Sequence, residues 1–337
     1  MQLFHYKTLH LIIISNVKPS TMINKQIEER LKSILPSAKL PSCISFEADK
    51  DRLFVKLGGR GVVANMQTDK SAFEGWSILL KSDIPNIKNI ILDWENPLFN
   101  ADKDKRRREE THYNRFLIRV ANFKHAYPWF DISKERISEV AKMQKFLDSG
   151  TIVVNFPQKP CKPVANGNKK REATLERELV ESLRKGCPIT DEQLPVGLFR
   201  NGIVSKANAL TPSGASQIDL WQLDNDTMKI YELKVKGNES IGIISELFYY
   251  VCIVKNIVEG HIKYPDVSKA VSHRHLKDFA DAVTNEKIHK IIGYFAAPRL
   301  HPLLASPQLK NKVFEILNGN MLGIQFKFYD LSYLIEQ

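Results

Sequence analysis

One segment of this chain joins two alternating apolar runs through a short polar turn, and it constrains the fold more than any other. Ile218–Leu223 and Met228–Val235 flank the polar residues 224–227. Asn225 and Asp226, at the centre of that turn, tolerate the left-handed backbone conformations that tight hairpins require. The pattern predicts an antiparallel β-hairpin with a two- or four-residue loop.

The predicted register brings two carboxylates together. If Leu223 pairs with Met228, then Asp219 faces Glu232, and Lys234 points to the same face because side chains alternate along a strand. Opposed carboxylates repel, and a divalent cation between them removes the repulsion; hard oxygen ligands suit magnesium or manganese. We therefore expect a metal site with the ammonium of Lys234 beside it. The alternative is an exposed hairpin face whose charges are solvated.

A helix predicted over 171–185 carries a further acid on its apolar side. The apolar stripe is formed by Leu175, Leu179, Val180 and Leu183. Projected at helical spacing, Glu176 lies inside this stripe. A buried acid is costly unless a metal or a partner satisfies it, so Glu176 is a candidate site residue. A capping or edge-of-core role is the alternative.

The clearest change of composition lies at 157–170, which contains three prolines, a glycine and several lysines. Such a stretch is typical of a linker. We predict a mixed α/β domain of unknown role over 1–156, a basic linker over 157–170, and a second domain over 171–337. In the first domain the pattern predicts helices at 22–35, 71–81, 110–123 and 133–147, and strands at 44–48, 53–57, 87–94 and 151–155. In the second it predicts helices at 171–185, 240–257 and 305–318, and strands at about 196–204, 218–223, 228–235, 290–297 and 323–329.

Charge and cysteine usage limit the class of protein. The 49 Lys and Arg residues exceed the 38 Asp and Glu residues, and this net charge of +11 favours a polyanionic partner such as nucleic acid. The four cysteines are scattered, which argues against a zinc site or a disulfide framework. The longest apolar stretch, Ile241–Val254, contains Glu246 and is too short to span a bilayer. We expect a reduced, cytoplasmic, soluble protein with no membrane partner.

Asp219 with Glu232-Leu233-Lys234 resembles the motif of the PD-(D/E)XK nuclease superfamily. The string from Glu176 to Gly186 is similar to the first helix of archaeal Holliday-junction resolvases. The resemblance covers about 171–330 and departs from the superfamily name at residue 218, where Ile replaces Pro. It implies a restriction-endonuclease-like α-β-β-β-α-β core, so the expected fold class is α/β, with this core following the N-terminal mixed domain.

The resemblance also implies a mechanism. Asp219, Glu232 and the carbonyl of Leu233 would hold Mg²⁺, for which Mn²⁺ is a substitute, and Glu176 would bind through water or a second ion. Lys234 would help to activate the attacking water. These four side chains are the predicted catalytic residues.

Four more residues are auxiliary candidates. Glu246 and Tyr250 lie four residues apart on the predicted helix after the hairpin, where several branches of the superfamily have a Gln and a Tyr. A helix-face Glu and a structural Tyr are the alternative. Ser216 and Gln217 directly precede the first acid, where backbone N–H groups can approach a phosphate. An ordinary loop is the alternative.

Two basic clusters are candidates for contact with nucleic acid. One is a run before a predicted helix, formed by Lys105, Arg106, Arg107 and Arg108. The other is in the linker, formed by Lys169 and Lys170. Both clusters can contact backbone phosphates, and solvated loops are the alternative.

We therefore expect a Mg²⁺-dependent DNA endonuclease that serves in defence against foreign DNA or in repair. The N-terminal domain would provide target choice, partner binding or self-association. Two alternatives stay open: a nuclease-like nucleic-acid-binding or assembly module without catalysis, and an RNase on the same scaffold.

Overall fold

The computed structural model describes residues 22–155, 171–212, 216–263 and 273–334, and in them the chain is a mixed α/β protein. The first sheet has the order β1-β2-β3-β4-β5 and is formed by β1 (Met22–Ile23), β2 (Ile44–Asp49), β3 (Arg52–Leu57), β4 (Asn89–Trp94) and β5 (Phe130–Ile132). Its helices are α1 (Asn24–Ile34), α2 (Phe73–Asp83), α3 (Lys103–Ala126) and α4 (Ile137–Leu147). The predicted hairpin of β2 and β3 is confirmed, and Lys50 in its turn has a φ of 56°.

The second sheet has the order β13-β12-β10-β9-β7. Its strands are β7 (Thr190–Pro195), β9 (Gln217–Asp224), β10 (Thr227–Leu233), β12 (Lys290–Ala297) and β13 (Gln325–Asp330). β7, β9 and β10 are antiparallel neighbours. β12 is parallel to β10, and β13 is parallel to β12. The sheet is therefore mixed, and β10 lies at its centre.

Two helices cover opposite faces of this second sheet. α5 (Arg171–Arg184) packs its apolar side chains against Leu220, Tyr231 and Leu233. α6 (Gly242–Val258) packs on the other face, where Leu247 lies against Gly293 of β12. Because side chains alternate along a strand, even-numbered residues of β10 face α6.

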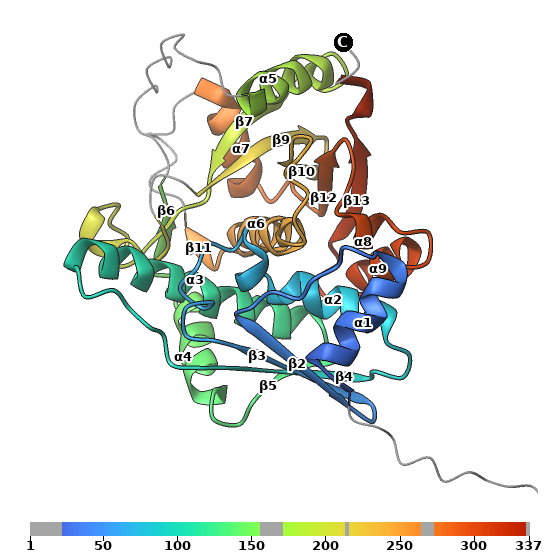
Figure 1. The fold of residues 1–337 in the computed structure, drawn as a ribbon. Helices are drawn as coiled ribbons and strands as arrows, with labels where there is room; N and C mark the ends of the chain where they lie inside the picture. Colours follow the sequence, from blue (N-terminus) through green and yellow to red (C-terminus); the bar gives the residue numbers. More distant parts are fainter. Residues whose placement is uncertain (1–21, 156–170, 213–215, 264–272, 335–337) are drawn as a thin grey trace, which may run out of the picture.

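α6 also joins the two halves of the chain. Figure 1 shows it between the second sheet and helices α2 and α3, with the first sheet beyond them. The ring of Phe248 on α6 lies 5.2 Å from that of Phe123 on α3. A Cβ on Gly75 of α2 would come within 2.6 Å of the carbonyl oxygen of Ile241, so only glycine allows this approach. The two sheets thus share one hydrophobic core.

A buried ion pair fastens this junction. Arg119 on α3 binds both carboxylate oxygens of Glu74 on α2, and both side chains are almost inaccessible to solvent. The hydroxyl of Ser245 on α6 donates to the same carboxylate at 2.7 Å. A paired and hydrogen-bonded charge of this kind is tolerated in a core, whereas either partner alone is not.

A third, three-stranded sheet is built from both halves of the sequence. It has the order β11-β6-β8 and consists of β6 (Ile152–Val154), β8 (Leu198–Phe199) and β11 (Ile262–Lys263). The linker predicted at 157–170 falls between β6 and α5 and lies outside the described residues, so the domain boundary stays a prediction.

Two predicted elements need correction, and one helix was missed. The strand predicted at about 196–204 is confirmed only at β8 (Leu198–Phe199), and the edge strand β7, which ends at Pro195, was not predicted. The helix predicted at 305–318 is two helices, α8 (Pro302–Ala305) and α9 (Lys310–Asn318), since Pro307 lies between them. α7 (Leu276–Thr284) was not predicted.

Within the described residues, no helix has the length and apolar character needed to cross a membrane.

Candidate functional site

The hairpin of β9 and β10 has the predicted register. Leu223 pairs with Met228 across a two-residue turn, in which Asn225 has the left-handed φ of 55°. Continuing the ladder by one residue beyond its last pair places Asp219 opposite Glu232. The ladder pairing is confirmed, and it sets both acids on the sheet face that α6 covers.

Lys234 lies beside these acids, as predicted. Its ammonium binds Oε1 of Glu232, two residues earlier on the same face. The backbone N–H of Leu233, between them, donates to Oδ2 of Asp219 at 2.9 Å, which holds the first acid against the end of β10. Asp219 is partly exposed, whereas Glu232 and Lys234 are buried.

The structure adds Glu246 to this group. Its Oε2 accepts a hydrogen bond from Nζ of Lys234 at 2.9 Å, and its side chain is buried. The hydroxyl of Tyr250, one turn later on α6, donates to Oε1 at 3.3 Å. In the sequence, these two residues were auxiliary candidates because of their i, i+4 spacing on the helix after the hairpin and the resemblance at these positions. We call Asp219, Glu232, Lys234 and Glu246 the acid cluster.

Sequence analysis missed Gln67, which also reaches the cluster. Its Nε2 donates to Oε1 of Glu246, although the two residues are far apart in the sequence. The loop that carries Gln67 is held against the start of α6, where Oδ1 of Asp69 accepts from the hydroxyl of Ser240 at 2.7 Å and from the N–H of Ile241 at 3.1 Å. No local pattern around Gln67 indicates this contact.

Burial and charge shift the titration of the cluster. Burial, with the nearby carboxylates of Asp219 and Glu246, raises the pKa of Glu232 well above its usual range. Burial alone would lower the pKa of Lys234, but the surrounding carboxylates outweigh it and raise that pKa well above its usual value. Burial also opposes ionisation of Glu246, yet Lys234 and the hydrogen bonds to this carboxylate hold its pKa below the usual value. The ion pair is therefore Lys234 with Glu246, and Glu232 resists ionisation.

A cavity of about 450 Å³ opens beside the cluster and is bordered by both halves of the chain. Glu246 and Tyr250 line it from α6, and four cationic side chains line it from elsewhere: Arg107, Arg108 and Arg115 of α3, and Lys206. Asp104 and Glu246 are the acids in its lining, so cations outnumber acids by four to two among the described residues. We call it the basic cavity. Its charge favours an anionic group next to the acid cluster.

The basic run of α3 divides into two sets. Arg107 and Arg108 line the basic cavity, and Arg107 donates to the carbonyl of Lys206. Arg106 instead pairs with Glu110 at 3.1 Å. The run lies in the first turns of α3 rather than in a preceding loop, and Asp102 caps it by accepting from the N–H of Lys105 at 2.9 Å. Lys169 and Lys170, the other predicted basic contacts, lie outside the described residues.

The remaining candidates come from α5 and from the start of β9. Glu176 is buried, as predicted, on α5, whose apolar residues pack against the opposite face of the hairpin. The hydroxyl of Ser216 donates to the carbonyl of Pro212 at 2.8 Å within its own loop. Gln217 begins β9 and pairs with Pro195 of β7. Their roles at the site stay predictions.

The oxygen atoms at the end of the hairpin fit a divalent cation. Oε2 of Glu232 is buried and has no hydrogen-bond partner among the described residues, so one carboxylate oxygen at the predicted position is available. Asp219 and the carbonyl of Leu233 complete an all-oxygen set of the kind that Mg²⁺ accepts. Across the described ranges, no three His, Cys, Asp or Glu side chains are grouped to hold a metal. A cation at this position would have two carboxylates and one backbone carbonyl as protein ligands, and waters would be its other ligands.

Comparisons of this chain with protein-family models, with curated proteins and with solved structures found no match.

Proposed function

We propose that this protein is a Mg²⁺-dependent nuclease that hydrolyses phosphodiester bonds in DNA. The observation that carries the proposal is the hairpin register, which turns two carboxylates and the ammonium of Lys234 to one face, next to the basic cavity. If β8, β11 and α7 are treated as insertions, the remaining order α5-β7-β9-β10-α6-β12 has the α-β-β-β-α-β pattern that the sequence motifs imply, which supports the same proposal.

Each residue of the cluster has a distinct task in this proposal. Asp219, Glu232 and the carbonyl of Leu233 would hold the cation, which when bound supplies Lewis-acid stabilisation of charge on the phosphate. The ammonium of Lys234 orients the attacking water and stabilises negative charge that develops on it, and Glu246 fixes the position of this ammonium from the side of α6. Arg107, Arg108 and Lys206 neutralise the phosphate backbone at the entrance.

A plasmid-nicking assay tests the proposal. Supercoiled plasmid, single-stranded DNA and RNA are each incubated with the full chain in Mg²⁺, Mn²⁺ or EDTA. We expect cation-dependent DNA cleavage that is lost in Asp219→Asn, Glu232→Gln and Lys234→Met. Asp226→Asn and Lys229→Met, in the same hairpin, are matched controls and should cleave normally. Cleavage at the wild-type rate by Glu232→Gln, or no cleavage of any substrate, would overturn the proposal.

One observation favours the alternative of a binding or assembly module without catalysis. Glu232, Lys234 and Glu246 are buried and largely satisfy one another, as in a structural ion-pair network. In that case the protein would bind plasmid without cutting it. The substitutions at Asp219, Glu232 and Lys234 would then lower only the stability of the protein. Cleavage of RNA but not DNA would instead identify an RNase.

A further inference from the structure

A buried arginine in the wall of the basic cavity lacks a carboxylate partner. Arg115 of α3 lines this cavity, and only 6% of its surface is exposed. Its Nη2 donates to Oδ1 of Asn65 at 3.0 Å and to Nδ1 of His112 at 2.9 Å. In the part of the chain that the structure describes, no Asp or Glu side chain forms an ion pair with it. Burial lowers the pKa of Arg115, as expected for a cation whose surroundings compensate it incompletely.

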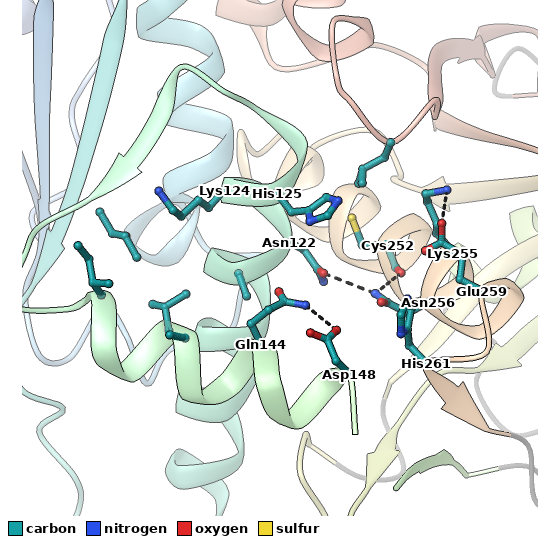
Figure 2. A pocket seen from close by; sticks show the side chains of 16 residues that line it. Asn122, Lys124, His125, Gln144, Asp148, Cys252, Lys255, Asn256, Glu259 and His261 are labelled. Carbon is teal, nitrogen blue, oxygen red and sulfur yellow. Dashed lines mark hydrogen bonds and ion pairs between the residues drawn. The ribbon is translucent and has the colours of Figure 1, made fainter. Parts of the chain in front are cut away.

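Two cations elsewhere in the fold show the usual arrangement. One turn later on α3, the buried Arg119 binds both carboxylate oxygens of Glu74. In a separate cavity of about 620 Å³ between α3, α4 and α6, Lys255 pairs with Glu259 at 2.8 Å (Figure 2). A buried charge without a counter-ion is costly. An anionic ligand in the basic cavity would supply the counter-ion that Arg115 lacks.

The guanidinium of Arg115 has donors left for such a ligand. It carries five N–H groups, and Nη2 uses two of them on Asn65 and His112. Nε and Nη1 have no acceptor among the described residues, and neither atom is closed to solvent. Three N–H groups of a buried cation are therefore open to the cavity that Arg115 lines.

His112 adds a fourth donor beside them. A guanidinium can only donate, so Nδ1 of His112 accepts from Arg115 and the ring proton lies on Nε2. Nε2 has no partner among the residues described and is not closed to solvent, and His112 also lines the basic cavity. The oxygen atoms of one anion can accept from both side chains.

The charge of the cavity indicates what kind of anion fits. Besides Arg115, its lining contains three exposed cations: Arg107, Arg108 and Lys206. Of the two acids in the lining, Glu246 is already paired with Lys234, which leaves Asp104. A phosphate monoester carries about 1.5 to 2 negative charges near pH 7, whereas an internal phosphodiester of a nucleic acid carries about one. The monoester therefore gains more in this cavity.

The size of the cavity favours the same ligand. Its volume of about 450 Å³ is within the range of pockets that hold small molecules. A phosphate at the end of a strand or on a free nucleotide can enter such a space. The internal phosphates of a duplex lie along its outer surface, and they cannot reach a side chain that is buried as deeply as Arg115.

We propose that Arg115 and His112 form a binding site for a phosphate monoester, with Arg107, Arg108 and Lys206 around its entrance. The monoester can belong to the end of a DNA strand or to a free nucleotide. Only the first of these sources depends on the proposed nuclease function. Binding itself needs neither the divalent cation nor cleavage.

The test measures binding to the full chain in EDTA by isothermal titration calorimetry. Thymidine 5′-monophosphate is compared with thymidine, and a short single-stranded oligothymidylate with a 5′- or 3′-phosphate is compared with the same strand without one. We expect the terminal phosphate to increase affinity about tenfold, equivalent to about 1.4 kcal/mol. Tighter binding of a phosphorylated strand than of the mononucleotide would identify a strand end as the ligand, and equal binding would identify a free nucleotide.

Substitutions at the buried arginine connect this preference to the site. Arg115→Gln removes the charge and should reduce the preference for phosphate to less than twofold, whereas Arg115→Lys keeps the charge and should retain part of it. Arg177→Gln is the matched control, because Arg177 is exposed on α5, which covers the opposite face of the second sheet. This control should keep the full preference.

One variant tests the site without risk to the core. Lys206 is exposed in the cavity lining, and Lys206→Glu should weaken the preference for phosphate at least threefold. Thermal unfolding verifies that each variant is folded. The proposal is overturned if the wild type shows no preference for the phosphorylated probes, or if a folded Arg115→Gln or Lys206→Glu protein keeps the full preference. Neither result depends on whether the protein cleaves DNA.

Discussion

Gln67 and Glu246 come from opposite halves of the chain, and the amide Nε2 of Gln67 donates a hydrogen bond to Oε1 of the buried Glu246 carboxylate. The other oxygen of this carboxylate binds Lys234. A residue of the first half therefore helps to position the ammonium at the candidate active site of the second half. This contact makes the acid cluster depend on the docking of the two halves.

The first prediction concerns this contact. Gln67→Leu removes the donor and leaves the Glu246 carboxylate with fewer partners, so Lys234 is held less firmly. Hydrogen bonds to charged groups contribute about 1.5–3 kcal/mol when buried, and we expect a loss near the lower value because Gln67 itself is exposed. Nicking should slow at least severalfold. Gln308→Leu, at another exposed position, is the control; equal rates in both variants would show that the contact is irrelevant to activity.

The second prediction separates a catalytic from a structural role of Lys234. Lys234→Met leaves the buried Glu246 carboxylate without its cation, which costs about 3–5 kcal/mol for a broken buried pair. Adding Glu246→Gln removes this carboxylate and should restore part of the stability, as measured by urea unfolding. Nicking should stay absent in the double variant. If activity returned together with stability, Lys234 would have only a structural role.

The third prediction is a pH dependence that arises at His112, in the lining of the basic cavity. Burial, with the nearby Arg115, Arg108 and Arg119, lowers the pKa of His112 to about 3. The unfolded chain then binds more protons than the folded one between about pH 3 and the ordinary pKa of about 6.5. Stability contributed by the neutral imidazole is therefore present above pH 6.5 and is lost as the pH falls through this window.

We expect this group to contribute a slope of up to about 1.4 kcal/mol per pH unit between pH 6 and pH 4. His112→Gln should flatten the pH profile of the free energy of unfolding, measured in urea. His289→Gln removes an exposed histidine and should leave the slope unchanged. An unaltered slope in His112→Gln would mean that the imidazole does not resist protonation in the folded protein.

The fourth prediction compares two neighbouring arginines of α3. Arg108 lines the basic cavity, whereas Arg106 pairs with Glu110 and lies outside the lining. If Arg108 contacts one phosphate, Arg108→Ala should weaken DNA binding and reduce the slope of log K against log salt by about 0.9. Arg106→Ala should change both quantities less. Fluorescence anisotropy of a labelled duplex in EDTA measures binding without cleavage, and identical effects of the two substitutions would exclude the cavity as the DNA entrance.

Much of the local structure follows from the sequence. The turn at Asn225 and the apolar alternation around it were enough to predict the pairing of β9 with β10, because a short loop fixes which residues face each other. The prediction was only partly right at 196–204, where Leu198 and Phe199 alone form a strand, and the preceding strand β7 belongs to a different sheet. Alternation along a chain does not specify which neighbouring strand a segment joins.

The sequence by itself determined the α/β class, the hairpin register and the common face of Glu232 and Lys234, since each depends on residues close together in the chain. Only the tertiary structure decided that Gln67 and Glu246 meet and that Arg107 and Arg108 border a cavity beside them. These arrangements depend on how α3 and α6 pack in the shared core. Packing of that kind is set by the shapes of many distant side chains together, and no short-range pattern encodes it.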